Sequence, residues 1–255
     1  MPVKVLEIWN NCKVGKPFKK NLMELEQTLN PTSFLSDSTR LEKARFNMIE
    51  QQIRTWEVLD SKILQLFQQV PREDFVPTQY KGLAFADIEI PIGHGQTMLS
   101  PKIEGRILQT LEIRKTDTVL EIGTGSGYLT ALLAKLSMQV RSVEIIEALS
   151  VLARSRLAKH DIDNVVLEVG DAAQGWPAHG PYDVIVFTGS MPILPKDIRQ
   201  QLKVGGRMFV VVGEPPAMEA VMIQCVATDN YRQQALFETC LPPLTNAPQP
   251  SRFEF

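Results

Sequence analysis

The second half of the chain alternates between strand-like and helix-like patterns, and this alternation constrains the fold more than any other feature. Short apolar runs predict strands, and leucines at helical spacing predict the helices between them. Strands separated by helices favour a doubly wound, mostly parallel α/β sheet. The short turn TDNY joins the last two strands, so we expect that pair to be antiparallel. Seven strands are expected, at 118–122, 139–145, 164–169, 182–189, 207–213, 219–227 and 231–241.

The remainder of the chain is predicted to flank this sheet. Two helices are expected within residues 37–70, close to the functional cleft, and Asp60 is a suitable N-cap for the second. Residues 1–36 are interpreted as an N-terminal extension, with a short docked helix at 22–29 as the alternative. The C-terminal residues 247–255 are interpreted as an extended tail, whose two phenylalanines could instead cover the cleft; these are Phe253 and Phe255.

Composition excludes several classes of function. The chain has 27 basic and 29 acidic residues, a balance that favours neither nucleic acid nor an anionic membrane as partner. Its three cysteines are far apart, so we expect no disulfide framework, no metal site and a cytoplasmic location. No apolar run approaches the roughly 18 residues of a membrane span, and no secretory signal is recognisable. A monomer is expected.

A glycine-rich turn follows the first strand of the α/β region, in the sequence LEIGTGSGYLT (120–130). Its third glycine comes one residue too early for the dinucleotide fingerprint, and no lysine completes a phosphate-binding P-loop. Acidic residues end or follow three successive strands: Glu121, Glu144 and Asp171. Ligands of parallel sheets bind at the carboxyl ends of the strands, so these acids and the turn are expected to form one site.

This pattern resembles the first motif of S-adenosylmethionine-dependent methyltransferases, and the resemblance implies their fold and cofactor. The small residues would let the backbone approach the amino-acid part of the cofactor, and an anionic Glu121 would suit its ammonium and sulfonium charges. Glu144 would accept the ribose hydroxyls, and Asp171 would receive the adenine amino group. The expected cofactor contacts are Glu121, Gly123, Thr124, Gly125, Glu144, Ile145, Asp171 and Ala172.

The segment before the first strand narrows the class of methyltransferase. No [DN]PP[YF] motif and no Pro-Cys pair occur, which lowers the case for a nucleic-acid substrate. The stretch AFADIEIPIGHGQTMLSP (84–101) resembles the loop of protein-L-isoaspartate O-methyltransferases, A-x-x-D-x-x-x-x-I-G-x-G-Q-T-I-S-x-P. VPREDFVP, GDAAQGWP and LPPLT resemble further family segments. The resemblance implies a domain over 37–246, with a substrate loop at 84–101 and a Rossmann-like core at 117–241. Its substrates would be damaged proteins or peptides with L-isoaspartyl or D-aspartyl carboxylates.

One departure from the family pattern concerns the substrate. The family's active-site serine falls on Leu99, so Ser100 or Thr97 is expected to supply the catalytic hydroxyl. Ala172 replaces a usual glycine, and Gly189–Ser190 replaces a usual alanine pair. These changes leave two alternatives to isoaspartyl methylation, namely transfer to another carboxylate or small molecule, and a non-catalytic homologue that kept the cofactor pocket.

Three further residues carry two interpretations each. His94 could orient a substrate carboxylate, or it could be a loop residue facing solvent or the rim of the cleft. Gln96 could bind the substrate backbone or brace its own loop. Trp176 could line the adenine pocket or have a packing role.

Overall fold

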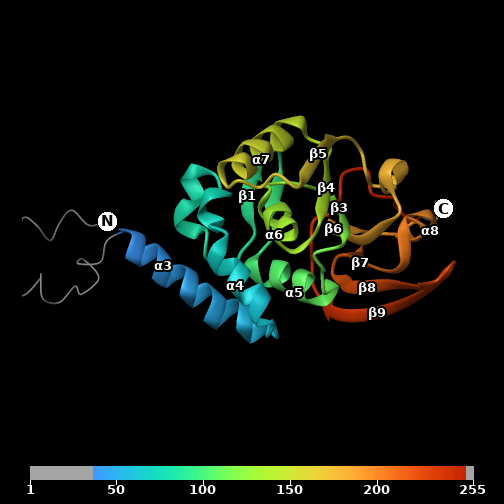
Figure 1. Cartoon of the computed structure of the whole chain (residues 1–255), viewed down its shortest axis with the longest axis horizontal. Coiled ribbons are helices and arrows are strands. Elements are labelled where there is room, and N and C mark those ends of the chain that lie inside the picture. Colours follow the sequence, from blue (N-terminus) through green and yellow to red (C-terminus); the bar gives the residue numbers. More distant parts are fainter. Residues whose placement is uncertain (1–36, 251–255) are drawn as a thin grey trace, which may run out of the picture. The chain divides into compact units, whose positions relative to one another are not determined.

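The computed structural model describes residues 37–250 (Figure 1). The expectations for residues 1–36 and for the two terminal phenylalanines lie outside the described residues. The chain divides after Ala44 into two compact units. Residues 37–44 belong to the first and form the start of helix α3 (Asp37–Asn47). The second unit contains the seven-stranded sheet. No helix within residues 37–250 is long and apolar enough to cross a membrane.

The predicted helix after Asp60 is present as α4 (Ser61–Gln69), which ends before Pro71. The Asp60 carboxylate accepts the backbone N–H of Lys62 at 2.8 Å and so satisfies one of the free donors of the first turn. The helix over Pro101–Leu111, α5, was not predicted. The other helical segments are η2 (Met48–Ile53), η3 (Arg54–Trp56), η4 (Arg72–Asp74), η5 (Thr78–Leu83), α5 (Pro101–Leu111), α6 (Tyr128–Leu136), α7 (Glu147–Lys159), η6 (Pro177–His179) and α8 (Lys196–Arg199).

The sheet has seven strands in the order β5-β4-β3-β6-β7-β8-β9, which confirms the predicted fold class. The first five of these are mutually parallel, and β8 runs antiparallel to both of its neighbours. The predicted antiparallel closing pair is therefore confirmed. The strands are β3 (Thr118–Ile122), β4 (Gln139–Glu144), β5 (Val165–Val169), β6 (Tyr182–Met191), β7 (Leu202–Glu214), β8 (Ala217–Ala227) and β9 (Asn230–Glu238).

The two faces of the sheet bury different cores. Val119 and Val184 point to one face, where they pack with leucines of α5, α6 and α7. Leu120 and Ile185, the next residues along the same strands, point to the other face. That face is covered mainly by the short helix α8 and by irregular segments near Ala172 and Ala247. The strand alternation thus produces two cores, but the longer helices gather on one face.

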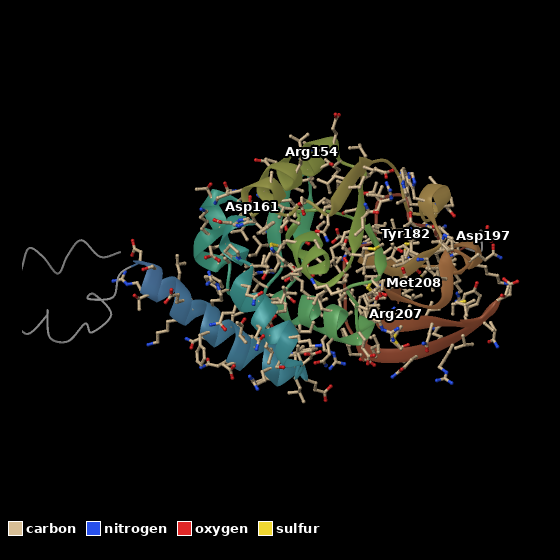
Figure 2. The ribbon with its side chains drawn as sticks, in the orientation of Figure 1. Arg154, Asp161, Tyr182, Asp197, Arg207 and Met208 are labelled. Carbon is tan, nitrogen blue, oxygen red and sulfur yellow. The ribbon has the colours of Figure 1, made fainter. Side chains whose placement is uncertain are left out.

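Hydrogen bonds from strand β7 connect the sheet to the segment between α5 and β3. Arg207 and Met208, both labelled in Figure 2, are consecutive residues of β7, and Met208 is buried in the second core. The Arg207 guanidinium donates to the carbonyl of Leu111 at 2.7 Å and to the carboxylate of Asp117 at 2.7 Å. These bonds hold the end of α5 against the start of β3, on which the glycine-rich turn depends.

Candidate functional site

A cleft opens at the carboxyl ends of β3, β4, β5 and β6. About 710 Å³ of empty space lies within it, open solvent included. No residue of the predicted helices at 45–70 lines it, because within the described unit α4 packs against α5 and α6 instead. The lining comprises Ile92, Gln96, Thr97, Leu99, Ile122, Gly123, Gly125, Val143, Glu144, Ile145, Leu149, Gly170, Asp171, Ala172, Ala173, Thr188, Gly189, Pro242, Pro243, Leu244 and Thr245.

The glycine-rich turn forms the floor of this cleft and depends on the absence of side chains. Gly123 has φ 95°, and a Cβ there would lie 2.2 Å from the hydroxyl of Thr188. Gly125 has φ 53°, and a Cβ there would lie 3.2 Å from Ile92. Both conformations are strained for residues with side chains. The cradle therefore suits a ligand that approaches the backbone closely.

Glu144, the last residue of β4, holds the turn and also lines the cleft. Its Oε2 accepts the Gly125 N–H at 2.8 Å, and its Oε1 accepts the Ile146 N–H at 3.0 Å. Two backbone amides thus fix the carboxylate at the edge of the turn. A carboxylate oxygen can accept more than one hydrogen bond, so Glu144 can still accept hydrogen bonds from the hydroxyl groups of a ligand.

Asp171 follows β5 and faces the cleft beside Ala172. Its Oδ1 accepts the Ala173 N–H at 2.9 Å, and its Oδ2 accepts the Asn246 side-chain amide at 2.8 Å. The carboxylate is therefore positioned by its own loop and by the C-terminal segment. Trp176 does not line the cleft; its indole N–H donates to Glu168 at 2.7 Å, so it has the packing role.

Glu121 differs from the prediction, because it is fully buried and does not line the cleft. Its Oε2 accepts the hydroxyls of Thr130 at 2.5 Å and Ser142 at 2.6 Å. Ser142 in turn lies 2.6 Å from the hydroxyl of Thr124, a buried residue behind the turn. Burial raises the pKa of Glu121 to about 8, so the group is mostly neutral near pH 7. Glu121 lies beneath the turn and supports it, so the structure lends no support to the expected anionic contact with the ligand.

Replacing Glu121 by glutamine is expected to flatten the dependence of stability on pH. The folded-state pKa of Glu121 is raised from 4.5 to about 8, so the folded protein binds more protons than the unfolded chain across this window. Stability from this group is therefore lost as pH rises. Urea unfolding from about pH 5 to about pH 9 should show a smaller loss in Glu121→Gln than in wild type. Parallel profiles would contradict the assignment, and the exposed Glu147→Gln is the matched control.

The loop before α5 is a hairpin of β1 (Ile90–Gly93) and β2 (Gln96–Met98) rather than irregular chain. Gln96, Thr97 and Leu99 line the cleft, and the Thr97 hydroxyl donates to Glu89 at 3.0 Å. His94 sits exposed in the hairpin turn with φ 54° and does not line the cleft, as the second interpretation expected.

Ser100 is the second departure from the predicted site. It is 5% exposed, does not line the cleft and stands at the N-cap of α5. The neighbouring Leu99 lines the cleft instead. Successive residues of an extended segment point in opposite directions, so only one of the two can face the ligand. The structure offers no support for Ser100 as the source of the catalytic hydroxyl.

The C-terminal segment 242–245 completes the cleft, and only the resemblance of LPPLT to a family segment pointed to it. The Ser190 N–H donates to the Pro242 carbonyl at 2.9 Å, and the Leu244 N–H donates to the Ser190 carbonyl at 3.0 Å. The Ser190 hydroxyl donates to the Leu241 carbonyl at 2.9 Å. A Cβ at Gly189 would lie 2.9 Å from Leu244. The Gly189–Ser190 pair therefore lets this segment pass close to β6 and binds it there.

The glycine cradle, the strand-end acids and the sheet order define the fold of S-adenosylmethionine-dependent methyltransferases. A Plasmodium falciparum structure described as a protein-L-isoaspartate O-methyltransferase, in complex with S-adenosyl-L-homocysteine, has the same fold. It superposes with a TM-score of 0.67 at 20% identity, over 78% of this chain and 97% of that chain.

Sequence comparison identifies the family. The family model of protein-L-isoaspartate(D-aspartate) O-methyltransferase matches residues 43–248, and the chain belongs to this family. Protein-L-isoaspartate O-methyltransferase 1 of Rhodopseudomonas palustris is 38% identical, covering 82% of this chain and 85% of the relative. The enzyme of Aeropyrum pernix is also 38% identical, covering 82% of each.

Proposed function

We propose that this protein methylates the free carboxylate of L-isoaspartyl and D-aspartyl residues in damaged proteins, with S-adenosylmethionine as the methyl donor. The observation that carries the proposal is the shared cleft, in which Thr97 and Leu99 of the hairpin loop face the glycine turn at Gly123 and Gly125. Family membership supports both the reaction and the cofactor.

The residues of the cleft fit this cofactor. Glu144 would accept the ribose hydroxyls, and Asp171 would accept the adenine amino group. The turn at Gly123, Thr124 and Gly125 would hold the amino-acid end, with Ile145 and Ala172 as apolar walls. When bound, S-adenosylmethionine supplies a methyl group that its sulfonium activates for transfer.

The chain needs no general base for this reaction. The free α-carboxyl group of an isoaspartyl residue has a pKa of about 3.3–3.7 and the side-chain carboxyl group of a D-aspartyl residue one of about 3.9, so either substrate is already a nucleophile at neutral pH. The protein has to hold the carboxylate in line with the methyl group and exclude water. Leu99 presents an apolar wall. The loop brings two side-chain donors into the cleft, the Gln96 amide and the Thr97 hydroxyl, whose hydrogen bond would move from Glu89 to the substrate. We propose Thr97, and no longer Ser100, as the residue that positions the substrate carboxylate.

Further assignments belong to the same proposal. The methyltransferase domain is taken as 37–246, supported by the family match to 43–248. A cytoplasmic, monomeric protein without nucleic-acid partners is proposed from the composition and from the free thiols of Cys225 and Cys240.

A methylation assay with an isoaspartyl peptide and its normal aspartyl twin tests the reaction. Wild type is expected to methylate only the isoaspartyl peptide. Thr97→Val should lower the rate about tenfold to hundredfold, because a hydrogen bond to a charged group is lost. Ser100→Ala should stay close to wild type, since Ser100 does not face the cleft. Leu99→Ser should be as fast as wild type or faster.

Leu99 favours one alternative, transfer to a different carboxylate. If wild type ignores the isoaspartyl peptide and Leu99→Ser accepts it, the protein acts on another acid and the proposal is wrong. Binding of the cofactor without turnover in either protein would favour a non-catalytic homologue. A rate loss in Ser100→Ala with none in Thr97→Val would assign the catalytic hydroxyl to Ser100 and not to Thr97.

A further inference from the structure

A second, smaller pocket lies behind the hairpin loop and continues from the main cleft. The two linings have five residues in common, namely Thr97, Leu99, Gly123, Gly125 and Thr188. The small pocket encloses about 310 Å³ of empty space, open solvent included. Its other lining residues are Met98, Glu104, Thr124, Ser126 and Leu129.

Glu104 is the one titratable side chain among these lining residues, and neither the family pattern nor the reaction above assigns it a role. It lies on α5 and is 1% exposed. Its Oε2 accepts a hydrogen bond from Arg72, while the residues that the structure describes donate none to Oε1. Oε1 is not fully enclosed by protein atoms, so this oxygen is open to the pocket and can accept a hydrogen bond from a ligand there.

Arg72 fixes the position of Glu104 relative to the hairpin loop. Its guanidinium donates to the carbonyl of Leu99 at 2.6 Å and to that of Ala84 at 2.9 Å, and it lies 4.9 Å from the centre of the Tyr128 ring. The Glu104 carboxylate is therefore preorganised beside Leu99 before any ligand arrives. Preorganised charge is what distinguishes a binding group from a solvated surface acid.

The positions of the other acids decide which part of the cofactor reaches this pocket. Glu144 and Asp171 line the main cleft and not the small pocket, whereas Glu104 lines only the small pocket. Gly123 and Gly125 lie in both linings, so the glycine turn borders the main cleft and the small pocket alike. With ribose and adenine at Glu144 and Asp171, the amino-acid end of the cofactor extends across the turn toward Glu104.

We propose that Glu104 binds the ammonium group of the methionine end of the cofactor. The inference rests on the proposed cofactor orientation. An ammonium group brings three donors and a positive charge to the free Oε1. A charge-assisted bond of this kind in a buried site is strong. A substrate carboxylate is a poor occupant of the same place, because it would meet the charge of Glu104.

The proposed role of Glu104 also predicts that binding of the cofactor depends on pH. Burial raises its pKa to about 7, and the opposite charge of Arg72 lowers it. The other titratable groups that face it are Tyr128 of α6, beneath Arg72, and Glu121 of β3, whose pKa Glu104 helps to raise. Because a bound cation favours the ionised form, binding should release protons near pH 7, and affinity should increase from about pH 6 to about pH 8.

Calorimetry with two probes tests the proposal. S-adenosyl-L-homocysteine carries the amino-acid end, and 5′-methylthioadenosine lacks it. Glu104→Gln should weaken binding of the first about tenfold to hundredfold and leave the second within about twofold, because the variant removes one charged hydrogen bond. Unfolding curves establish that the variant is folded. An equal loss for both probes, or no loss for either, overturns the proposal.

Wild-type protein provides the test that needs no variant. Binding of S-adenosyl-L-homocysteine should strengthen with pH and release protons in buffers of different ionisation heat, whereas 5′-methylthioadenosine should show neither effect. A pH dependence that persists in Glu104→Gln and vanishes in Glu121→Gln would assign it to Glu121 and overturn the proposal. If wild type binds neither probe, the cofactor assignment itself fails. If wild type binds both probes and Glu104→Gln binds them with the same affinities, only the proposed role of Glu104 is contradicted.

Discussion

Replacing Arg72 by methionine is expected to lower the free energy of unfolding by about 3–5 kcal/mol, because it leaves a buried acid without its partner. Arg72 is fully buried and pairs with Glu104, which is 1% exposed. The same substitution removes the donors to the carbonyls of Ala84 and Leu99. Methionine retains an unbranched apolar side chain, so the loss reports mainly on the polar contacts. Urea denaturation followed by circular dichroism is the measurement.

Arg54→Met is the matched control for this prediction. Arg54 pairs with Glu50 one turn away on an exposed surface, so its loss should cost less than about 1 kcal/mol. Adding Glu104→Gln to Arg72→Met should recover part of the stability, because the unpaired acid is removed while the two carbonyls stay without donors. If Arg72→Met costs no more than Arg54→Met, the pair does not organise the loop.

Replacing Glu144 by alanine is expected to weaken cofactor binding by about 1–3 kcal/mol, or roughly 5-fold to 150-fold, if the carboxylate holds the ribose. Glu144 also accepts the N–H groups of Gly125 and Ile146, so the variant loosens the cradle as well. The lost ribose contacts act on the nucleoside part, which both probes contain, whereas the loosened cradle acts on the amino-acid end. Calorimetry should therefore show a loss for S-adenosyl-L-homocysteine and for 5′-methylthioadenosine alike.

This pattern separates Glu144 from Glu104, whose variant should affect only the probe with the amino-acid end. Glu147→Ala is the control, because Glu147 is exposed at the start of α7 and does not line the cleft. An unchanged affinity in Glu144→Ala would remove its role in binding. A selective loss for S-adenosyl-L-homocysteine would place the amino-acid end, and not the ribose, beside Glu144.

The sequence determined the sheet and the location of the cleft. Val, Ile and Thr recur at 118–122 and 139–145 and are sufficient to predict β3 and β4, although polar residues such as Glu121 and Arg141 interrupt both segments. The carboxyl ends of parallel strands meet at one edge. Glu144 and Asp171, at the ends of two such strands, therefore face one cleft with the glycine turn.

Only the tertiary structure decided which polar groups face the ligand. Glu121 lies within β3, opposite Ser142 of β4, and α6 covers it with Thr130. Its burial and its pKa depend on these neighbours, which are distant in sequence. Leu99 and Ser100 are adjacent, and the entry into α5 determines which of them turns to the cleft. Glu104 carries no sequence signal, because its role depends on Arg72 and on a pocket that the folded chain alone creates.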